Sequence, residues 1–152
     1  MSADVVIPTY ARGDLIDETL TAIRASTFSD FTLYVVDQSK DERTLRTVES
    51  HICQDSRIRY LHLVQHGTTL ARNAGVAQGQ APYIVFADDD CVPEPEWLGE
   101  MVKELQDPET WAVFGRVIPE TPEEAMSQGE DVSPAIKIAY KKEPERRVYQ
   151  AN

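Results

Sequence analysis

Short apolar runs rich in β-branched residues alternate along this chain with amphipathic segments of helical period. The first run, residues 4–8, precedes a segment in which Ile16, Leu20 and Ile23 recur at the spacing of one helix face. Similar runs follow at residues 31–36, 58–64, 82–87 and 111–118, with amphipathic segments between them. Because strands that alternate with helices form parallel sheets through right-handed crossovers, we predict an α/β fold with a mostly parallel sheet flanked by helices on both faces.

Three residues mark expected element ends. Pro8 lacks an N–H group and is expected to end the first strand. Asp14 is expected to cap the first helix, and Pro95 is expected to open the helix that follows residues 82–87. These positions predict compact strand–loop–helix units.

The length of 152 residues, 41% of them hydrophobic, suits one compact domain with a single core. We expect this domain to cover residues 1–118. Residues 119–134 are rich in Glu, Pro, Ser and Gly and are expected to form an acidic loop. After this loop, Ile136, Ile138 and Tyr140 alternate weakly, and the pattern fits either a strand or a turn of amphipathic helix.

The net charge of the chain limits the classes of partner that it could bind. The chain has 26 acidic and 15 basic residues, a formal net charge of -11, and this argues against binding to nucleic acid through phosphate contacts. An acidic protein that handles a phosphorylated ligand would need a cation between them. No apolar stretch is long enough for a membrane span and no signal peptide is visible, so we expect a cytoplasmic protein. Cys53 and Cys91 are expected to be free thiols.

Three consecutive aspartates, Asp88, Asp89 and Asp90, follow the most apolar run. Ligands of open parallel sheets gather at the carboxyl ends of the strands, where this run would lie. Adjacent carboxylates repel one another, and a Mg²⁺ or Mn²⁺ ion held by one or two of them would compensate the charge. The alternative is a solvated acidic turn in which one aspartate caps the next helix.

Other polar residues fall at the same edge. Thr9 and Tyr10 follow the first strand and Asp37 ends the second, where its carboxylate could bind a base or ribose or form an Asx-turn. Arg72 could contact a phosphate, lock an aspartate in place or lie free on the surface. The histidines lack metal-ligand spacing, and we interpret His51 as a surface residue.

Four stretches together resemble the family 2 glycosyltransferases of the GT-A fold. They are "VVIPTYARGDLIDETLTAI", "YVVDQSKD", "LARNAGVAQG" and "YIVFADDDCVPEPEWL", in the order and approximate spacing of that family. The resemblance covers residues 4–105. It implies a metal-dependent, inverting transfer of a sugar from a nucleotide-diphosphate sugar, usually linked to UDP or GDP, to a saccharide or other acceptor.

The resemblance also implies roles for single residues. Pro8, Thr9 and Tyr10 would lie against the nucleoside, Asp37 would bind the base, and Arg72 would lie near the base or diphosphate. The aspartate run matches the family's DxD motif. Asp90, with Asp88, would bind the metal, while Asp88 and Asp89 would address the sugar and ribose hydroxyls of the donor.

The chain departs from the family pattern in two ways. Ala11 stands where Asn is usual, and Gln38 stands where Asn, Asp or Gly is common. The family's general base is an Asp in an acceptor-binding half, and we expect it beyond residue 152, with residues 119–152 as the start of that half.

We therefore expect the donor-binding portion of a longer enzyme. An exposed apolar surface on such a portion could pair with a second copy. The alternatives are a non-catalytic nucleotide-sugar-binding module and a sugar-phosphate nucleotidyltransferase. The second would need a Gly-rich basic loop after the first strand, where this chain has only Arg12 and Gly13.

Overall fold

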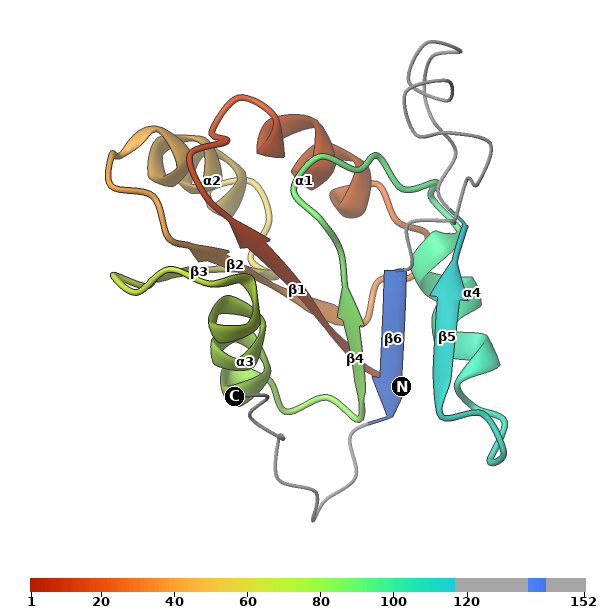
Figure 1. Ribbon diagram of the computed structural model, residues 1–152. Coiled ribbons are helices and arrows are strands. Elements are labelled where there is room, and N and C mark those ends of the chain that lie inside the picture. Colours follow the sequence, from red (N-terminus) through yellow and green to blue (C-terminus); the bar gives the residue numbers. More distant parts are fainter. Residues whose placement is uncertain (117–136, 142–152) are drawn as a thin grey trace, which may run out of the picture.

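The computed structural model describes residues 1–116 and 137–141, which form a six-stranded sheet with helices on both faces (Figure 1). The strand order is β3-β2-β1-β4-β6-β5. The elements are β1 (Ala3–Thr9), α1 (Ile16–Arg24), β2 (Phe31–Asp37), α2 (Arg43–Ile52), β3 (Ile58–His62), α3 (Thr68–Gln78), β4 (Tyr83–Phe86), α4 (Trp97–Glu104), β5 (Ala112–Gly115) and β6 (Lys137–Lys141). Strands β1 to β4 run parallel, and β6 is antiparallel to β4 and β5. The predicted α/β class is confirmed.

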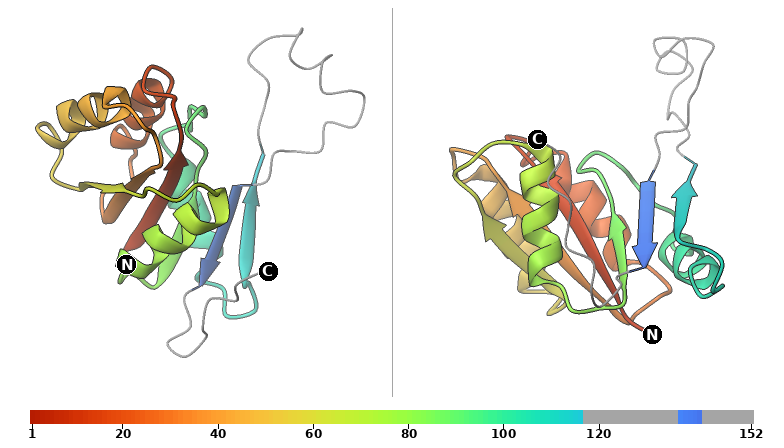
Figure 2. Two further views of the ribbon diagram at one scale, coloured as in Figure 1. Left: turned by 60° about the vertical axis from the view of Figure 1, so that its left-hand side comes forward. Right: turned by 60° about the horizontal axis from the view of Figure 1, so that its bottom comes forward.

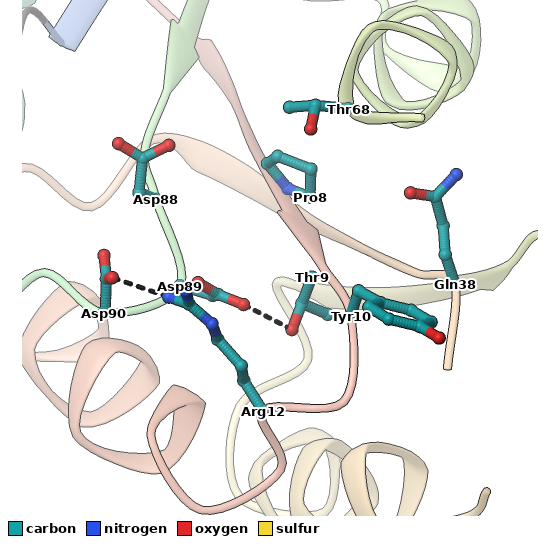
Figure 3. A pocket seen from close by; sticks show the side chains of 9 residues that line it. All are labelled: Pro8, Thr9, Tyr10, Arg12, Gln38, Thr68, Asp88, Asp89 and Asp90. Carbon is teal, nitrogen blue, oxygen red and sulfur yellow. Dashed lines mark hydrogen bonds and ion pairs between the residues drawn. The ribbon is translucent and has the colours of Figure 1, made fainter. Parts of the chain in front are cut away.

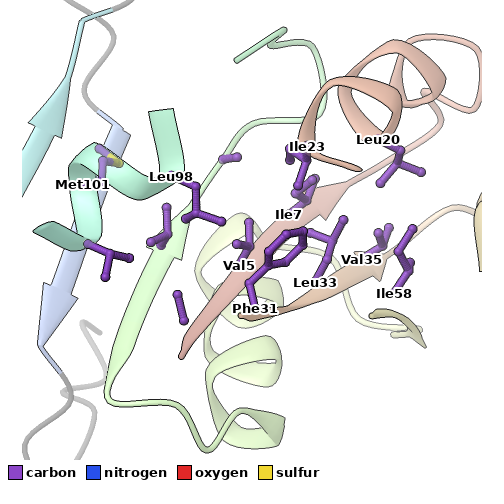
Figure 4. Close-up of a cluster of buried hydrophobic side chains, with 14 of the residues drawn as sticks. Val5, Ile7, Leu20, Ile23, Phe31, Leu33, Val35, Ile58, Leu98 and Met101 are labelled. Atoms are coloured by element: carbon purple, nitrogen blue, oxygen red, sulfur yellow. The ribbon is translucent and has the colours of Figure 1, made fainter. Parts of the chain in front are cut away.

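The two faces of the sheet are covered by different helices (Figure 2). On β1, Val5 and Ile7 face the core formed with α1, α2 and α4, which Figure 4 shows from close by. Val6, between them, faces α3 and joins a second core with Val36 of β2. This alternation follows from the period of two along a strand, and the apolar runs supply both faces because both are covered.

Helix α3 packs close against the sheet at Gly75. A Cβ atom added at this glycine would lie 2.4 Å from Cγ1 of Val6 and 3.3 Å from Cγ2 of Val36. The absence of a side chain therefore sets how near the helix lies to β1 and β2. It also sets the position of Thr68, where the helix begins at the carboxyl edge of the sheet.

Strand β1 continues through Pro8, so the expectation that this proline ends the strand is wrong. Pro8 pairs in register with Val36, and Thr9 with Asp37. The carbonyl of Val6 accepts from Ala87 on the β4 side, whereas the carbonyl of Thr9 accepts from Gln38 on the β2 side. Because alternate residues face the same neighbour, Pro8 faces the β4 side beyond the end of β4, where no ladder bond needs its N–H.

Two helices begin later than expected. Helix α1 starts at Ile16, and Leu15 rather than Asp14 stands at its N-cap, without a side-chain cap. The carbonyl of Arg12 accepts from the N–H groups of Leu15 and Ile16, so a turn already leads the chain into this helix. Helix α4 starts at Trp97 instead of Pro95, whose carbonyl accepts from Thr27 of the α1–β2 loop.

The C-terminal part is described only in places. Strand β5 lies within the predicted 111–118 run, of which residues 117 and 118 lie outside the described residues. Of the weakly alternating residues 136–140, residues 137–140 lie in a strand, β6, and residue 136 lies outside the described residues. The expected acidic loop and acceptor region, residues 119–152, lies outside the described residues except for residues 137–141. Among the described helices, none is long and apolar enough to cross a lipid bilayer.

Candidate functional site

A cavity of about 400 Å³ opens at the carboxyl ends of β1, β2 and β4, where we predicted a ligand site from the sequence. Figure 3 shows the side chains that surround it. They come from the end of β1 and the loop after it, the loop after β2, the first residue of α3 and the loop after β4, and are Pro8, Thr9, Tyr10, Arg12, Gln38, Thr68, Asp88, Asp89 and Asp90. Of the residues predicted for the site, all but Asp37 and Arg72 line this cavity.

The three aspartates have different surroundings. The side chains of Asp88 and Asp90 are 48% and 46% exposed, whereas that of Asp89 is 9% exposed. Asp88 pairs with Arg72 of α3 at 3.3 Å. The short loop after β4 thus turns two carboxylates toward solvent and buries the middle one, which reduces the repulsion expected among three adjacent charges.

Asp89 fastens the acidic loop to the protein. Its Oδ2 accepts from Oγ1 of Thr9 at 2.7 Å, and its backbone carbonyl accepts from the buried hydroxyl of Thr19 at 3.0 Å. Burial raises the pKa of Asp89, although the bond from Thr9 and the charge of Arg12 oppose this shift. The carboxylate that we expected to address donor hydroxyls is therefore engaged with Thr9 of β1 and with Arg12 in this structure.

Arg12 lies beside the aspartate run, which the sequence analysis missed. Its Nη1 donates to Oδ2 of Asp90 at 2.6 Å and to Oδ1 of Asp89 at 3.2 Å. The hydrogen bond to Asp90 and the charges of both carboxylates raise the pKa of Arg12 further. The run is thus neutralised in part by two arginines, one from the β1–α1 loop and one from α3.

Asp37 does not line the cavity. Its carboxylate is fully buried and accepts from the N–H and hydroxyl of Ser39 and, at 2.8 Å, from the hydroxyl of Tyr60. Burial, then the bond to Asp37, raise the pKa of Tyr60 well above its usual range. The Asx-turn alternative considered for this residue matches the bond to the Ser39 N–H, and the contact to a base stays a prediction.

Gln38, the residue that follows Asp37, lines the cavity. Its side-chain amide nitrogen donates to the carbonyls of Gln65 and Gly67, so it ties the end of β2 to the loop before α3. Gly67 has a φ of 141°, a conformation that favours glycine. Nothing in the pattern of a lone glutamine could have indicated this bridge.

Among the described residues, one aromatic ring, that of Tyr10, lines the cavity. Tyr10, 49% exposed, meets the ring of His66 edge to face at a centroid distance of 4.7 Å. The guanidinium of Arg72 lies 5.6 Å above the ring of Phe86, and the Nε atom of Arg72 is buried without a hydrogen-bond partner. An exposed ring offers a stacking surface to a flat ligand group.

The carboxylates of Asp88 and Asp90 suit a divalent cation that also binds water or ligand phosphates. Within residues 1–116 and 137–141, no group of three or more His, Cys, Asp or Glu residues could enclose a metal. Asp88 and Asp90 nevertheless present exposed oxygen donors to one cavity. Mg²⁺ and Mn²⁺ are commonly held by one or two carboxylates together with water and substrate phosphates, so this donor set fits them. Such a cation would bring charge neutralisation to a phosphorylated ligand.

His51, which we interpreted as a surface residue, is buried between α1 and α2, so that interpretation is wrong. It is 3% exposed and contacts Asp17 through Nε2 at 2.8 Å and Arg24 through Nδ1 at 3.1 Å. The helix period places it on the same face as Val48, which is buried. A polar ring suggests exposure to solvent, and nothing in the sequence indicated that Asp17 and Arg24 would contact its two ring nitrogens. It lies outside the cavity wall.

Comparison with known proteins identifies the family. The chain belongs to glycosyl transferase family 2, whose profile, described as "Glycosyl transferase family 2", matches residues 4–149. The uncharacterized glycosyltransferase EpsJ of Bacillus subtilis (strain 168) is 29% identical over 86 residues, 57% of this chain and 25% of that protein. The family resemblance stated from the motifs is thereby confirmed.

Solved structures share the fold. Residues 1–349 of S. aureus TarS, in complex with UDP-GlcNAc, match with a TM-score of 0.65 and 25% identity over 79% of this chain and 37% of that one. The mannosyltransferase PcManGT of Pyrobaculum calidifontis, in complex with GDP-Man and Mn²⁺, matches with a TM-score of 0.72 and 22% identity over 91% and 44% of the two chains. The predicted GT-A type of sheet is confirmed.

The chain spans only part of these proteins. It covers a quarter of the length of EpsJ and less than half of each solved chain. What the comparisons establish for this chain is therefore its family and its fold.

Proposed function

We propose that this chain forms the donor site of a glycosyltransferase that transfers a sugar, with inversion, from a nucleotide-diphosphate sugar in the presence of a divalent cation. The observation that carries the proposal is the meeting of Tyr10, Thr68 and the Asp88–Asp90 run around one cavity at the carboxyl edge of the sheet. Each of these three features suits one part of such a donor. The ring of Tyr10 suits the base, the helix start at Thr68 suits the diphosphate, and the aspartates suit the cation bound to the diphosphate. The UDP-GlcNAc bound to TarS supports a uridine donor among the candidates.

The geometry supports a proposed position for each part of the donor. The exposed ring of Tyr10 would stack against the base. The diphosphate would lie between the first turn of α3, which has no side-chain cap, and Asp88 and Asp90, which would hold the cation. A helix N-terminus favours anions, and the cation would offset the repulsion from the carboxylates.

An inverting transfer also needs a general base for the acceptor hydroxyl. Of the three carboxylates of the cavity wall, those of Asp88 and Asp90 are assigned to the cation, and that of Asp89 accepts from Thr9 and Arg12. We therefore assign the general base to none of the described residues. The proposal does not specify the acceptor.

Calorimetric titration with UDP and with GDP, each with and without Mn²⁺, tests the proposal. We expect one nucleotide to bind only with Mn²⁺ present, and we expect Asp90→Ala to weaken that binding at least about tenfold, or about 1.4 kcal/mol. Binding that needs no metal and is unchanged by Asp90→Ala would contradict the cation site.

Asp41→Ala is the matched control. Asp41 is another carboxylate with a 48% exposed side chain that pairs with an arginine, Arg43, but it lies outside the cavity wall. It changes the net charge by the same amount as Asp90→Ala. Nucleotide binding should be the same in this variant as in the unmodified chain.

A further inference from the structure

Arg12 occupies the carboxylate that the cation would need. Its shortest contact is the 2.6 Å bond to Oδ2 of Asp90, and the two side chains are equally exposed, at 46% each. An ion pair this open to water contributes at most about 1 kcal/mol, so a competing partner can displace it.

The backbone around Arg12 is held independently of this ion pair. The preceding residue, Ala11, donates its N–H to Oγ of Ser39 at 2.8 Å, and the carbonyl of Arg12 accepts from Leu15 and Ile16 at 3.1 Å each. Only the side chain of Arg12 would therefore have to move for Asp90 to be released.

Asp89 has partners besides Arg12. The hydroxyls of Thr9 and Thr19 hold its carboxylate and its backbone carbonyl. Loss of Arg12 would thus free Asp90 without unfastening the acidic loop, and a guanidinium released at the cavity wall would face whatever anion the cavity holds.

We propose that Arg12 is an exchangeable counter-ion, which pairs with Asp90 in the ligand-free protein and passes to the diphosphate when the cation takes its place. This inference rests on the proposed donor site. It makes cation and nucleotide bind cooperatively, because the cation alone must break the Arg12–Asp90 pair, whereas the nucleotide gives Arg12 a new partner.

The inference predicts opposite effects of Arg12→Ala on two affinities. Mn²⁺ alone, measured by electron paramagnetic resonance of the free ion, should bind about three- to tenfold more tightly, because an opposing cation is gone. The nucleotide, titrated in saturating Mn²⁺, should bind about tenfold more weakly, because a charge-assisted contact is lost. Arg12→Lys keeps the charge without the planar guanidinium. Both of its affinities should lie between those of the unmodified chain and those of Arg12→Ala.

Arg46→Ala controls for the change in net charge. Arg46 pairs with Glu42 on the exposed side of α2, outside the cavity wall, and its removal should leave both affinities unchanged. Thermal unfolding of each variant shows whether the fold is intact before binding is measured.

The outcomes separate the two proposals. If the unmodified chain binds nucleotide in an Mn²⁺- and Asp90-dependent manner but Arg12→Ala binds Mn²⁺ no more tightly, the counter-ion role is wrong and the donor site stands. A loss of both affinities in Arg12→Ala would show a structural role and overturn the inference equally. If the unmodified chain binds neither Mn²⁺ nor nucleotide, the donor site itself fails and the inference fails with it.

Discussion

Ala11 adopts a backbone conformation that alanine seldom takes. Its φ is 55°, in the left-handed region, and it is the only non-glycine residue of the described part with positive φ. The bond from its N–H to Ser39 holds it there, and Ser39 in turn donates to the buried Asp37. Strain of this kind gathers at binding sites, and here it directs the chain toward Arg12 and the aspartates.

The strain at Ala11 should be relieved by an asparagine. Left-handed backbone costs alanine about 1–2 kcal/mol and costs asparagine less, so Ala11→Asn should raise the free energy of unfolding by about 0.5–1 kcal/mol in urea denaturation. Ala11→Val, with a β-branched side chain, should lower it. An order in which Val is as stable as Asn would contradict the conformation described for this residue.

The residues of the site could be predicted from the sequence only in part. The aspartate run was found because it follows a fully apolar strand, a pattern that places it at the ligand edge. Arg12 was missed because an arginine in a polar loop is usually a surface residue. Its contact with Asp90 spans 78 residues of sequence and exists only because β1 and β4 are neighbours.

At the scale of elements, α3 depends on the glycine in its middle. Gly75→Ala would bring a Cβ to 2.4 Å from Val6, so we expect the helix to shift and the free energy of unfolding to fall by about 1–3 kcal/mol. The shift would also move Thr68, so nucleotide binding by calorimetry should weaken in the same variant.

Gly99 of α4 provides the matched control. A Cβ there would meet Phe28 at 3.6 Å, an ordinary contact. Gly99→Ala should therefore raise the free energy of unfolding by about 0.5–1 kcal/mol, as expected for alanine in a helix. Equal effects of the two substitutions would show that close packing at α3 is not the cause.

Elements were predicted more fully than their ends. The period of two or of 3.6 in the apolar residues is a property of each segment, so strands and helices could be read locally. Their ends depend on neighbours: Pro8 stays in β1 because β4 has ended beside it, and Pro95 stays out of α4 because its carbonyl binds Thr27. The antiparallel place of β6 between β4 and β5 likewise has no local signal.

For the whole molecule, the excess of acidic residues makes paired carboxylates important to stability. Asp55, before β3, accepts from the backbone N–H of Arg57 at 3.0 Å and from its guanidinium at 2.7 Å, and its side chain is 10% exposed. Arg57 also lies 4.1 Å above the ring of Phe31 and donates to the carbonyl of Arg24. This cluster joins the end of α1 to the starts of β2 and β3.

The Asp55 cluster makes part of the stability depend on pH. The hydrogen bond from Arg57 lowers the pKa of Asp55, so the folded protein binds fewer protons at this site than the unfolded chain. Its contribution is present above the unfolded pKa of about 4 and is lost as the pH falls through the lower folded value. Asp55→Asn should lower the free energy of unfolding by about 1–2 kcal/mol at pH 7, and the difference should shrink below about pH 4.

Asp41 repeats the same arrangement on an exposed turn. It accepts from the N–H and guanidinium of Arg43, two residues on, but its side chain is 48% exposed. Asp41→Asn should therefore cost less stability than Asp55→Asn in urea denaturation across the same pH range. A larger loss at Asp41 would show that burial of the pair does not set its strength.

The central place of β1 has a consequence for a chain that is still being synthesised. Its partner β2 follows directly, but β4 leaves the ribosome only after residue 82. Until then one side of β1 has unpaired backbone groups, and Thr9 and Arg12 have no aspartates to contact. The nascent chain therefore exposes an open strand edge to which another chain could attach, and the cavity at the carboxyl edge of the sheet is completed only after the Asp88–Asp90 run has emerged.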